Sequence, residues 1–308
     1  MIKYSFVVPA YNEEKGLCIF YETVIKSFDK LDGEFELSFV NDGSRDATKS
    51  ILGEICKKDK HVKAVHFSRN FGQQAAILCG MEKSSGQAVI VMDADLQDPP
   101  AVALAMIEKW KQGYKIVHGK RRSRDKDSAF KRWSAKLFYK YAQKITGLSI
   151  PQNVGDFKLY DRQVVDTILA LPEHDRLLRV QTSWIGFSQT EVEFDRPARV
   201  AGDGHYTFKK MFSLACGGIF PNCTFPLGFA WKTGFFLTCA SVIAFITFVI
   251  LSVVDVYFGG LIAWLFPALG LCTGLILLGQ GFANLRLNMI YKEVQNRPKF
   301  IVDEEENV

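Results

Sequence analysis

The sequence lacks the features that mark disulfide-rich, zinc-binding or nucleic-acid-binding proteins. Its seven cysteines include no C-x-x-C pair, which favours reduced cytosolic or lipid-buried thiols over a disulfide framework or a zinc site. The apolar stretch within residues 1–14 is too short for an export signal and has no cleavage site. The basic run at residues 120–132 is accompanied by no recognised nucleic-acid motif. We therefore expect no nucleic acid partner, and this run fits anionic lipid or phosphate better.

Charge is also missing from two long stretches near the C-terminus. No Asp, Glu, Lys or Arg occurs from residue 233 to 254 or from residue 256 to 285. Each stretch exceeds the roughly 20 residues that cross a bilayer. We predict a hairpin of two membrane helices within residues 227–285, at about 229–254 and 261–285. The alternative, two buried helices of a soluble core, fits the length and the absence of charge less well.

Basic residues flank both predicted spans. Lys209, Lys210 and Lys232 precede the first, and four lysines and arginines follow the second between residues 286 and 299. By the positive-inside rule both flanks face the cytoplasm. We therefore expect a multi-pass membrane protein with a large cytoplasmic domain at residues 1–226 and a cytoplasmic tail at residues 286–308.

The first 120 residues alternate short β-branched runs with helical patterns, which predicts an α/β domain with a mostly parallel sheet. Helix starts carry matching signals: Ser44 and Asp46 can cap one helix, and Pro99 and Pro100 suit the first turn of another. Gly113 suits the end of that second helix. The expected strands cover residues 4–11, 35–42, 62–68, 88–95 and 115–119.

Polar side chains gather where the predicted strands end, which is where ligands bind in parallel sheets. Tyr11 and Glu13 follow the first strand, Asp42 the second, and Asp93 and Asp95 the fourth. Side chains at i and i+2 of an extended segment point the same way, so both aspartates of this D-x-D pair can converge on one Mg²⁺ or Mn²⁺ ion. The alternative is a polar turn that contains two aspartates by chance.

Arginines follow the fifth strand. Arg121, Arg122 and Arg124 lie close together, and Arg132 lies one or two helix turns later. Guanidinium groups match phosphate oxygens bidentately, so one or two of these residues are candidate phosphate ligands. A solvated charged loop is the alternative. The amphipathic stretch at residues 127–146 either lies on the membrane surface or packs on the domain.

Seven ordered motifs, followed by the two apolar stretches, closely resemble the polyisoprenyl-phosphate glycosyltransferases of glycosyltransferase family 2. Within that group the chain is most similar to bacterial bactoprenol glucosyltransferases, with dolichyl-phosphate mannose synthases as more distant relatives. The motifs are "VVPAYNEE", "VNDGSRDAT", "FSRNFGQQAA", "VIVMDADLQDPP", "GKRRSR", "NVGDFKLYDR" and "SWIGF".

The resemblance implies a GT-A fold, which is Rossmann-like, with a nucleotide-sugar site and a bound Mg²⁺ or Mn²⁺ ion. Asp95 is implied as a catalytic residue through this metal. The matched nucleotide-sugar positions are Pro9, Tyr11, Glu13, Asp42, Asp93, Ala94 and Arg121, and the matched metal positions are Asp93, Asp95 and Gln97.

The resemblance also places Arg132 and Arg199 near the donor and acceptor phosphates, and Asp156 at the position of the catalytic base. Asp156 has alternatives, because a lipid monophosphate has a second pKa near 6 and is already largely ionised at neutral pH. It can position the acceptor or stabilise charge at the anomeric carbon. It can also be a structural carboxylate that orients Lys158 or Arg162.

The implied activity is the inverting transfer of a hexose, expected to be glucose from UDP-glucose, to undecaprenyl phosphate at the cytoplasmic face of the bacterial plasma membrane. The family also implies a homo-oligomer. Two alternatives stay open: the same reaction with mannose, galactose or an amino sugar, and a catalytically silent membrane protein that binds a nucleotide sugar. A processive synthase needs a Q-x-x-R-W signature, and here Ala129 precedes Arg132-Trp133 at the glutamine position.

The chain departs from the family pattern at a few positions. Gly204 and His205 stand where relatives usually carry a hydroxyl residue and a lysine, and Cys216 stands where an acidic residue is frequent. The usual "GEYIGR" pattern before residue 290 is also missing. These departures concern the acceptor side and the oligomer surface.

Overall fold

The computed structural model of the 308-residue chain describes residues 2–28, 31–122, 154–173, 178–195 and 259–308. The chain divides into two compact units. The first unit comprises Met1–Leu214 together with Pro298–Val308, and the second comprises Ala215–Arg297. The last residues of the chain therefore belong to the same unit as the first.

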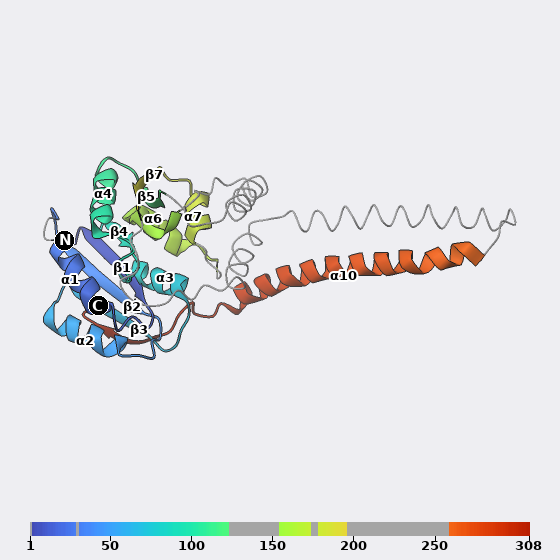
Figure 1. Ribbon diagram of the computed structural model, residues 1–308, viewed down its shortest axis with the longest axis horizontal. Coiled ribbons are helices and arrows are strands. Elements are labelled where there is room, and N and C mark those ends of the chain that lie inside the picture. The colour runs from blue at the N-terminus through green and yellow to red at the C-terminus, as the bar shows by residue number, and fades with distance from the viewer. Residues whose placement is uncertain (1, 29–30, 123–153, 174–177, 196–258) are drawn as a thin grey trace. The chain divides into compact units, whose positions relative to one another are not determined.

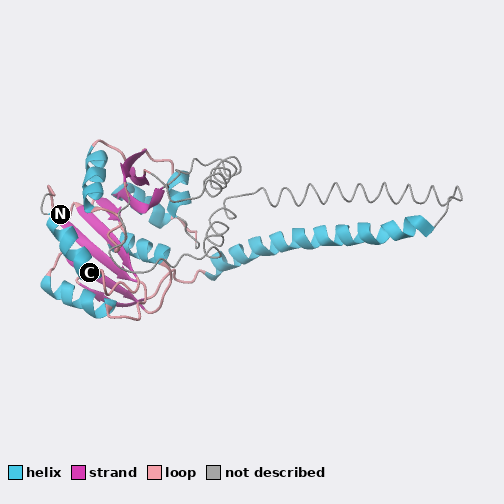
Figure 2. Cartoon of the chain, in the orientation of Figure 1, coloured by secondary structure: helices cyan, strands magenta, loops and turns pink. Residues whose placement is uncertain are grey.

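The first unit is built around one eight-stranded sheet in the order β7-β5-β6-β4-β1-β2-β3-β8 (Figures 1 and 2). Strands β4, β1, β2 and β3 are parallel neighbours, as are β5 and β7. Strand β6 is antiparallel to β4 and β5, and β8 is antiparallel to β3. The strands are β1 Tyr4–Ala10, β2 Phe35–Asn41, β3 Val62–Phe67, β4 Ala88–Val91, β5 Ile116–Arg121, β6 Val154–Asp161, β7 Gln189–Phe194 and β8 Val302–Glu306.

Helices cover both faces of this sheet, so the central strands are buried on both sides. Along β1, Tyr4, Phe6 and Val8 face one core with helices α1, α2 and α4, whereas Val7 faces the other with α3 and α6. This double burial explains the continuous apolar runs in the sequence. The helices among the described residues of the first unit are α1 Leu17–Phe28, α2 Thr48–Lys58, α3 Gln73–Lys83, α4 Pro100–Lys111, α6 Arg162–Ala170 and α7 Leu178–Trp184.

The predicted α/β class is confirmed, and the five predicted strands of the first 120 residues are present with ends shifted by a few residues. Pro99 and Pro100 begin α4 as predicted. Ser44 does not cap α2, because its hydroxyl accepts from the backbone N–H of Asn12 instead. Asp46 accepts from the N–H of Thr48 in the first turn of α2.

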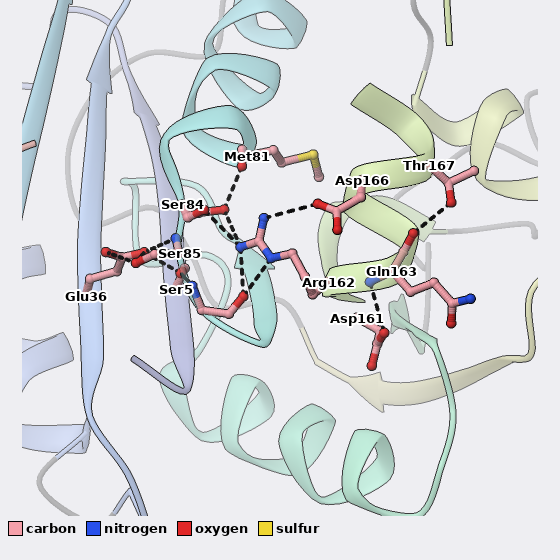
Figure 3. A network of polar contacts seen from close by, with 11 residues as sticks. Ser5, Glu36, Met81, Ser84, Ser85, Asp161, Arg162, Gln163, Asp166 and Thr167 are labelled. Carbon is pink, nitrogen blue, oxygen red and sulfur yellow. Dashed lines mark hydrogen bonds and ion pairs between the residues drawn. The ribbon is translucent and has the colours of Figure 1, made fainter. Parts of the chain in front are cut away.

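Strand β6 was not predicted, and its position between β4 and β5 matters for the site. Its antiparallel direction brings Asp156, near its start, beside the end of β4, where Val91 pairs with Lys158. The opposite end of β6 is fixed by Arg162, whose guanidinium donates to the carbonyl oxygens of Ser84 and Gly86 at 2.7–3.0 Å (Figure 3). This anchor joins β6 and α6 to the turn that precedes β4.

The same turn is tied to the first two strands by Glu36. Its buried carboxylate accepts from the backbone N–H of Ser85 at 2.7 Å and pairs with Lys63 at 2.8 Å (the contact with Ser85 is drawn in Figure 3). Ser5 also donates to Glu36. Buried charges are tolerated where they are paired and hydrogen-bonded in this way. The network fixes the edge of the sheet opposite the strand ends that carry the polar motifs.

The second unit contains helix α10, Gly259–Gln295, a single helix of 37 residues. The predicted second membrane span at residues 261–285 lies inside this helix, whereas the predicted first span at residues 229–254 lies outside the described residues. Within the described part of the chain, no helix meets the combined requirement of length and apolarity for a membrane span. The end of the expected C-terminal tail forms strand β8.

Candidate active site

The loops that follow β1 and β2 are locked together by reciprocal hydrogen bonds. The backbone N–H of Asn12 donates to Ser44 Oγ at 2.9 Å, and the N–H of Arg45 donates back to Asn12 Oδ1 at 2.9 Å. The N–H of Glu13 donates to Thr48 Oγ1 at 2.9 Å. Asn12 adopts φ of 56°, a left-handed conformation that asparagine tolerates better than most residues. The two motifs therefore form one rigid surface at the carboxyl edge of the sheet.

The predicted nucleotide residues lie on or beside this surface. Pro9 lies in β1 opposite Val40 of β2. Tyr11 follows the strand with its side chain exposed, and Glu13 is half-buried. The structure therefore brings Pro9, Tyr11 and Glu13 to one end of β1, where an aromatic side chain is accessible.

Asp42 is engaged with the protein's own backbone. Its carboxylate accepts from the N–H of Phe71 at 2.6 Å and from the N–H of Gly72 at 2.9 Å, just before α3 begins. Burial raises the pKa of Asp42, and these N–H donors together with Arg69 oppose that shift. Asp42 therefore holds the loop at residues 69–72, a role that the sequence did not suggest. Its expected contact with the nucleotide stays a prediction.

Gly43 allows the loop at residues 69–72 to pack closely against the loop that follows β2. Its φ is 65°, and a Cβ atom at this position would lie 2.4 Å from the carbonyl carbon of Arg69. A side chain is excluded on both grounds, because the conformation favours glycine and the space is filled by backbone. The "NDGS" motif thus needs its glycine for loop packing.

The D-x-D segment is a turn and not the end of a strand. Strand β4 ends at Val91, and the N–H of Asp93 donates to Asp98 Oδ2 at 3.1 Å. The N–H of Gln97 donates to Asp95 Oδ1 at 3.0 Å, and Leu96 has φ of 57°. Such side-chain to backbone bonds compete with strand pairing. The prediction that extended geometry aligns the two carboxylates is therefore wrong, although both lie in the same short turn with buried Ala94 between them.

Two adjacent glutamines connect the D-x-D turn to Asp156. Gln73 Nε2 donates to Asp93 Oδ1 at 2.9 Å, and Gln74 Nε2 donates to Asp156 Oδ2 at 3.2 Å. Both glutamines lie in the first turn of α3. The first turn of α3 therefore donates hydrogen bonds both to a carboxylate of the turn after β4 and to a carboxylate of β6.

Asp156 receives a second donor from α7. Arg179 Nε lies 3.3 Å from Asp156 Oδ1, and the N–H of Leu178 donates to Gln74 Oε1 at 3.4 Å. Both carboxylate oxygens of Asp156 thus accept hydrogen bonds. This arrangement orients the carboxylate toward a fixed direction, which suits a group that positions a substrate or supports developing positive charge.

Two further cations lie close to Asp156. Arg121 ends β5, and its guanidinium lies against Gly155, where a Cβ atom would come within 3.3 Å of a terminal nitrogen. Lys158 is buried in β6, and burial lowers the pKa of Lys158 to about 8, with Asp156 opposing the shift and Arg179 adding to it. The carboxyl edge therefore combines carboxylates with a half-buried arginine that can face phosphate.

The structure brings together most of the predicted site residues that it describes. The predicted phosphate residues Arg132 and Arg199 lie outside the described residues, as do Arg124, Gly204, His205 and Cys216. Prediction missed Gln73, Gln74 and Arg179 as site residues. The "FGQQ" motif was a usable signal for the glutamines, whereas Arg179 stands outside every quoted motif.

The donor set in the D-x-D turn fits a hard divalent cation. Among the described residues, no group of three or more His, Cys, Asp or Glu side chains is arranged to hold a metal ion. Asp93 and Asp95 offer two carboxylates, and Gln97 offers an amide. Mg²⁺ is commonly bound by one or two carboxylates, with water and substrate phosphates completing its coordination. The turn is therefore compatible with a metal that arrives with its substrate.

Comparison with known proteins identifies the family. Residues 5–169 match the family model described as glycosyl transferase family 2. The chain is 40% identical to an uncharacterized glycosyltransferase of Bacillus subtilis over 98% of this chain and 93% of that protein. It is 40% identical to the SfII prophage-derived bactoprenol glucosyl transferase of Shigella flexneri over 98% and 97% of the two chains. It is 39% identical to the bactoprenol glucosyl transferase of Shigella phage SfV over 99% of each chain. Matches of this extent show that the chain belongs to glycosyltransferase family 2.

Proposed function

We propose that this glycosyltransferase moves a hexose, expected to be glucose, from a nucleotide sugar to undecaprenyl phosphate. The observation that carries the proposal is the junction of Asp93 and Asp156 through Gln73 and Gln74, beside the interlocked loops after β1 and β2. Support for the acceptor comes from two relatives that are named bactoprenol glucosyl transferases and match almost the whole chain.

The donor nucleotide is proposed to bind at the surface formed by the loops after β1 and β2. Exposed Tyr11 offers an aromatic face beside Glu13, and UDP is the nucleotide expected from the resemblance. The diphosphate then extends toward the D-x-D turn and Arg121. A Mg²⁺ or Mn²⁺ ion held by Asp93, Asp95 and Gln97 would neutralise the charge of the diphosphate when bound.

The proposed reaction is one displacement at the anomeric carbon of the sugar. An oxygen of the lipid phosphate forms a bond to C1 while the bond from C1 to the diphosphate oxygen breaks, and the nucleoside diphosphate leaves with the electron pair. Configuration at C1 inverts. Arg121 is proposed to stabilise the phosphate charges of donor and acceptor, together with Arg132 and Arg199, which the resemblance assigns to the same task.

Asp156 is proposed to orient the reactants and not to remove a proton. The lipid phosphate is already largely ionised at neutral pH, so it needs little help from a base. Gln74 and Arg179 hold both oxygens of the Asp156 carboxylate. A negative charge fixed in this way can face the positive charge that develops at C1.

The protein is proposed to act at the cytoplasmic face of the bacterial plasma membrane. The absence of charge from residues 233–254 and 256–285 supports a hairpin of two membrane helices. Such an anchor keeps the site near the phosphate of a lipid whose isoprenoid chain stays in the bilayer. Assembly into a homo-oligomer stays a prediction from the family.

The test uses the full chain purified in detergent with undecaprenyl phosphate, Mg²⁺ or Mn²⁺, and a panel of radiolabelled UDP- and GDP-sugars. The expected result is label in the lipid phase from UDP-glucose, lost on addition of EDTA. Label from another sugar nucleotide would keep the reaction and change the sugar. Nucleotide binding without label in any lipid fraction would overturn the proposal in favour of a silent nucleotide-sugar-binding protein.

A further inference from the structure

The acidic C-terminal strand β8 is held firmly against β3. Glu305 pairs with Lys83 at 2.7 Å, and Glu304 pairs with Lys49 at 2.8 Å. Asn307 closes the edge by donating to the carbonyl oxygens of Cys56 and Val62 at 2.7 and 2.9 Å. These contacts tie the last residues of the chain to α2, β3 and α3 and thereby fix the position of Glu306.

Glu306 reaches inward and contacts buried His66. Its Oε1 lies 3.2 Å from His66 Nε2, and its side chain is only 22% exposed. Gly53 of α2 leaves the space for this carboxylate, because a Cβ atom there would lie 3.1 Å from Oε1 and 3.3 Å from Oε2. The position of Glu306 is therefore defined by packing as well as by its hydrogen bond.

The hydrogen-bond directions around His66 follow from Asn41. Asn41 Oδ1 accepts from the backbone N–H of Ser44 at 3.0 Å, which turns its amide nitrogen toward His66 Nδ1, also at 3.0 Å. Nδ1 must therefore accept, so the proton of neutral His66 resides on Nε2 and is donated to Glu306. Burial lowers the pKa of His66, which favours this neutral form, and Glu306 opposes the shift.

The hydrogen bonds from Glu306 through His66 to Asn41, here called the relay, end on the proposed nucleotide surface. Ser44, held through its N–H by Asn41, accepts at its hydroxyl from the N–H of Asn12. The C-terminal carboxylate is thereby linked through His66 and Asn41 to the loops that follow β1 and β2. A chain of buried hydrogen bonds of fixed direction can transmit position in this way.

A second contact supports the neighbouring loop. Phe300, just before β8, stacks on Phe67 with ring centroids 5.1 Å apart, and Phe67 meets Phe71 edge to face at 5.7 Å. Phe71 donates its N–H to Asp42. The C-terminal segment therefore supports the loop at residues 69–72, which in turn contacts Asp42 after β2.

We propose that Glu306 is a positioning residue, which sets the donor-binding loops in their binding geometry through His66 and Asn41, so that docking of β8 strengthens nucleotide binding. The ligand assignment rests on the proposed function. Loss of the relay should weaken nucleotide binding and leave the chemical step intact. Neither Glu306 nor His66 is among the residues proposed to surround the reacting groups near Asp156.

The test compares Glu306→Ala, Glu306→Gln and the matched control Glu305→Ala in the full detergent-purified chain. Binding of UDP and GDP is measured by calorimetry, and donor KM and kcat are measured by lipid labelling. Glu306→Ala is expected to raise the UDP Kd and the donor KM by about 3- to 10-fold, the worth of one lost hydrogen bond, with kcat within about 2-fold of the wild type. Glu306→Gln should restore most of the affinity, because its amide oxygen accepts from the same Nε2–H. Glu305→Ala should bind like the wild type, because Glu305 pairs with Lys83 on the other side of the strand.

A second variant guards against loss of β8 itself. Gly53→Ala keeps every acidic residue and crowds the Glu306 carboxylate, so it should weaken UDP binding in the same direction. Equal UDP binding in the wild type, Glu306→Ala and Gly53→Ala overturns the role of Glu306 and leaves the proposed function standing. Equal weakening in Glu305→Ala also overturns it, because the effect would then belong to strand charge. A wild type that binds neither UDP nor GDP and transfers no label overturns the proposed function and the inference with it.

Discussion

Arg179 donates from Nε to Asp156 Oδ1 at 3.3 Å, and this contact joins the short helix α7 to strand β6 at the candidate site. Gln74 donates to the other carboxylate oxygen. Asp156 is therefore held from two sides by residues far apart in the sequence. This arrangement distinguishes it from an exposed carboxylate whose orientation is set by solvent alone.

The first prediction concerns Arg179. Replacing it by Ala should lower kcat by about 10-fold, the low end of the worth of a charge-assisted hydrogen bond, because the Arg179 side chain is 40% exposed. The kcat of Arg179→Lys should lie between those of the wild type and Arg179→Ala, since lysine keeps the charge and loses the planar donor geometry. Steady-state lipid labelling measures the effect. The control is Lys57→Ala, which removes an exposed cation from the last turn of α2. Wild-type kcat in Arg179→Ala would show that the Asp156 contact does not serve the reaction.

The second prediction concerns Gln73 and the metal. Gln73 orients Asp93 through a 2.9 Å hydrogen bond, and loss of such a supporting contact typically costs about 10- to 100-fold in metal affinity. Gln73→Ala should therefore raise the Mn²⁺ concentration that gives half-maximal turnover by at least about 10-fold. Titration of Mn²⁺ in the labelling reaction measures this value, with exposed Gln112→Ala as the control. An unchanged metal requirement would mean that the turn alone orients Asp93.

The third prediction concerns Asp95. Asp95→Asn should reduce transfer by at least about 100-fold, because an amide cannot replace the charge of a metal-binding carboxylate. The fold should persist, because the asparagine Oδ1 can still accept from the N–H of Gln97. Lipid labelling and the thermal unfolding midpoint are measured together. Asp166→Asn, an exposed carboxylate of α6, serves as the control. Turnover like the wild type in Asp95→Asn would remove Asp95 from the metal site.

Local pattern was sufficient to predict much of the fold. Strands β1 to β5 were predictable because buried parallel strands need continuous apolar runs, such as Phe6–Val8 in β1. Strand β6 was missed because its place between β4 and β5 depends on distant contacts, including the anchor of Arg162 on Ser84 and Gly86. Strand β8 was missed because its acidic sequence resembles a solvated tail until Lys49 and Lys83 are placed beside it.

The residues of the candidate site were likewise predicted only in part. Asp93 was predicted because carboxylates that follow a predicted strand suit a divalent cation, and Asp156 was predicted because it lies in a motif that resembles the family. Gln73 and Gln74 were missed as site residues because an amide carries no charge and has no preferred ligand. The bend at Asp93 to Asp95 was missed because its cause, side-chain bonds to nearby N–H groups, is a matter of turn geometry that competes with strand pattern.

The last prediction concerns the pH dependence of stability and starts from buried His118. Its Nε2 lies 2.8 Å from Gln189 Oε1, and the Gln189 amide nitrogen donates to the carbonyl oxygen of Thr182, so Nε2 carries the proton. Among the described residues, Nδ1 has no hydrogen-bond partner. Burial, with Lys158 adding repulsion, lowers the pKa of His118 to about 4.

The sign of the effect follows from linkage between protonation and folding. An unfolded histidine has a pKa of about 6.5, so between pH 6.5 and about 4 the unfolded chain binds a proton that the folded chain excludes. The contribution of neutral His118 to the free energy of unfolding is therefore complete above pH 6.5 and is lost as the pH falls, by about 1.4 kcal/mol per pH unit.

Between pH 7 and pH 5 the free energy of unfolding of the wild type should fall by about 2 kcal/mol more than that of His118→Gln, which does not titrate. The thermal unfolding midpoint of the wild type should accordingly fall by about 4 to 8 °C more than that of the variant. His61→Gln, which removes an exposed histidine, should track the wild type. Parallel midpoints for the wild type and His118→Gln across this range would show that His118 is not held neutral by burial.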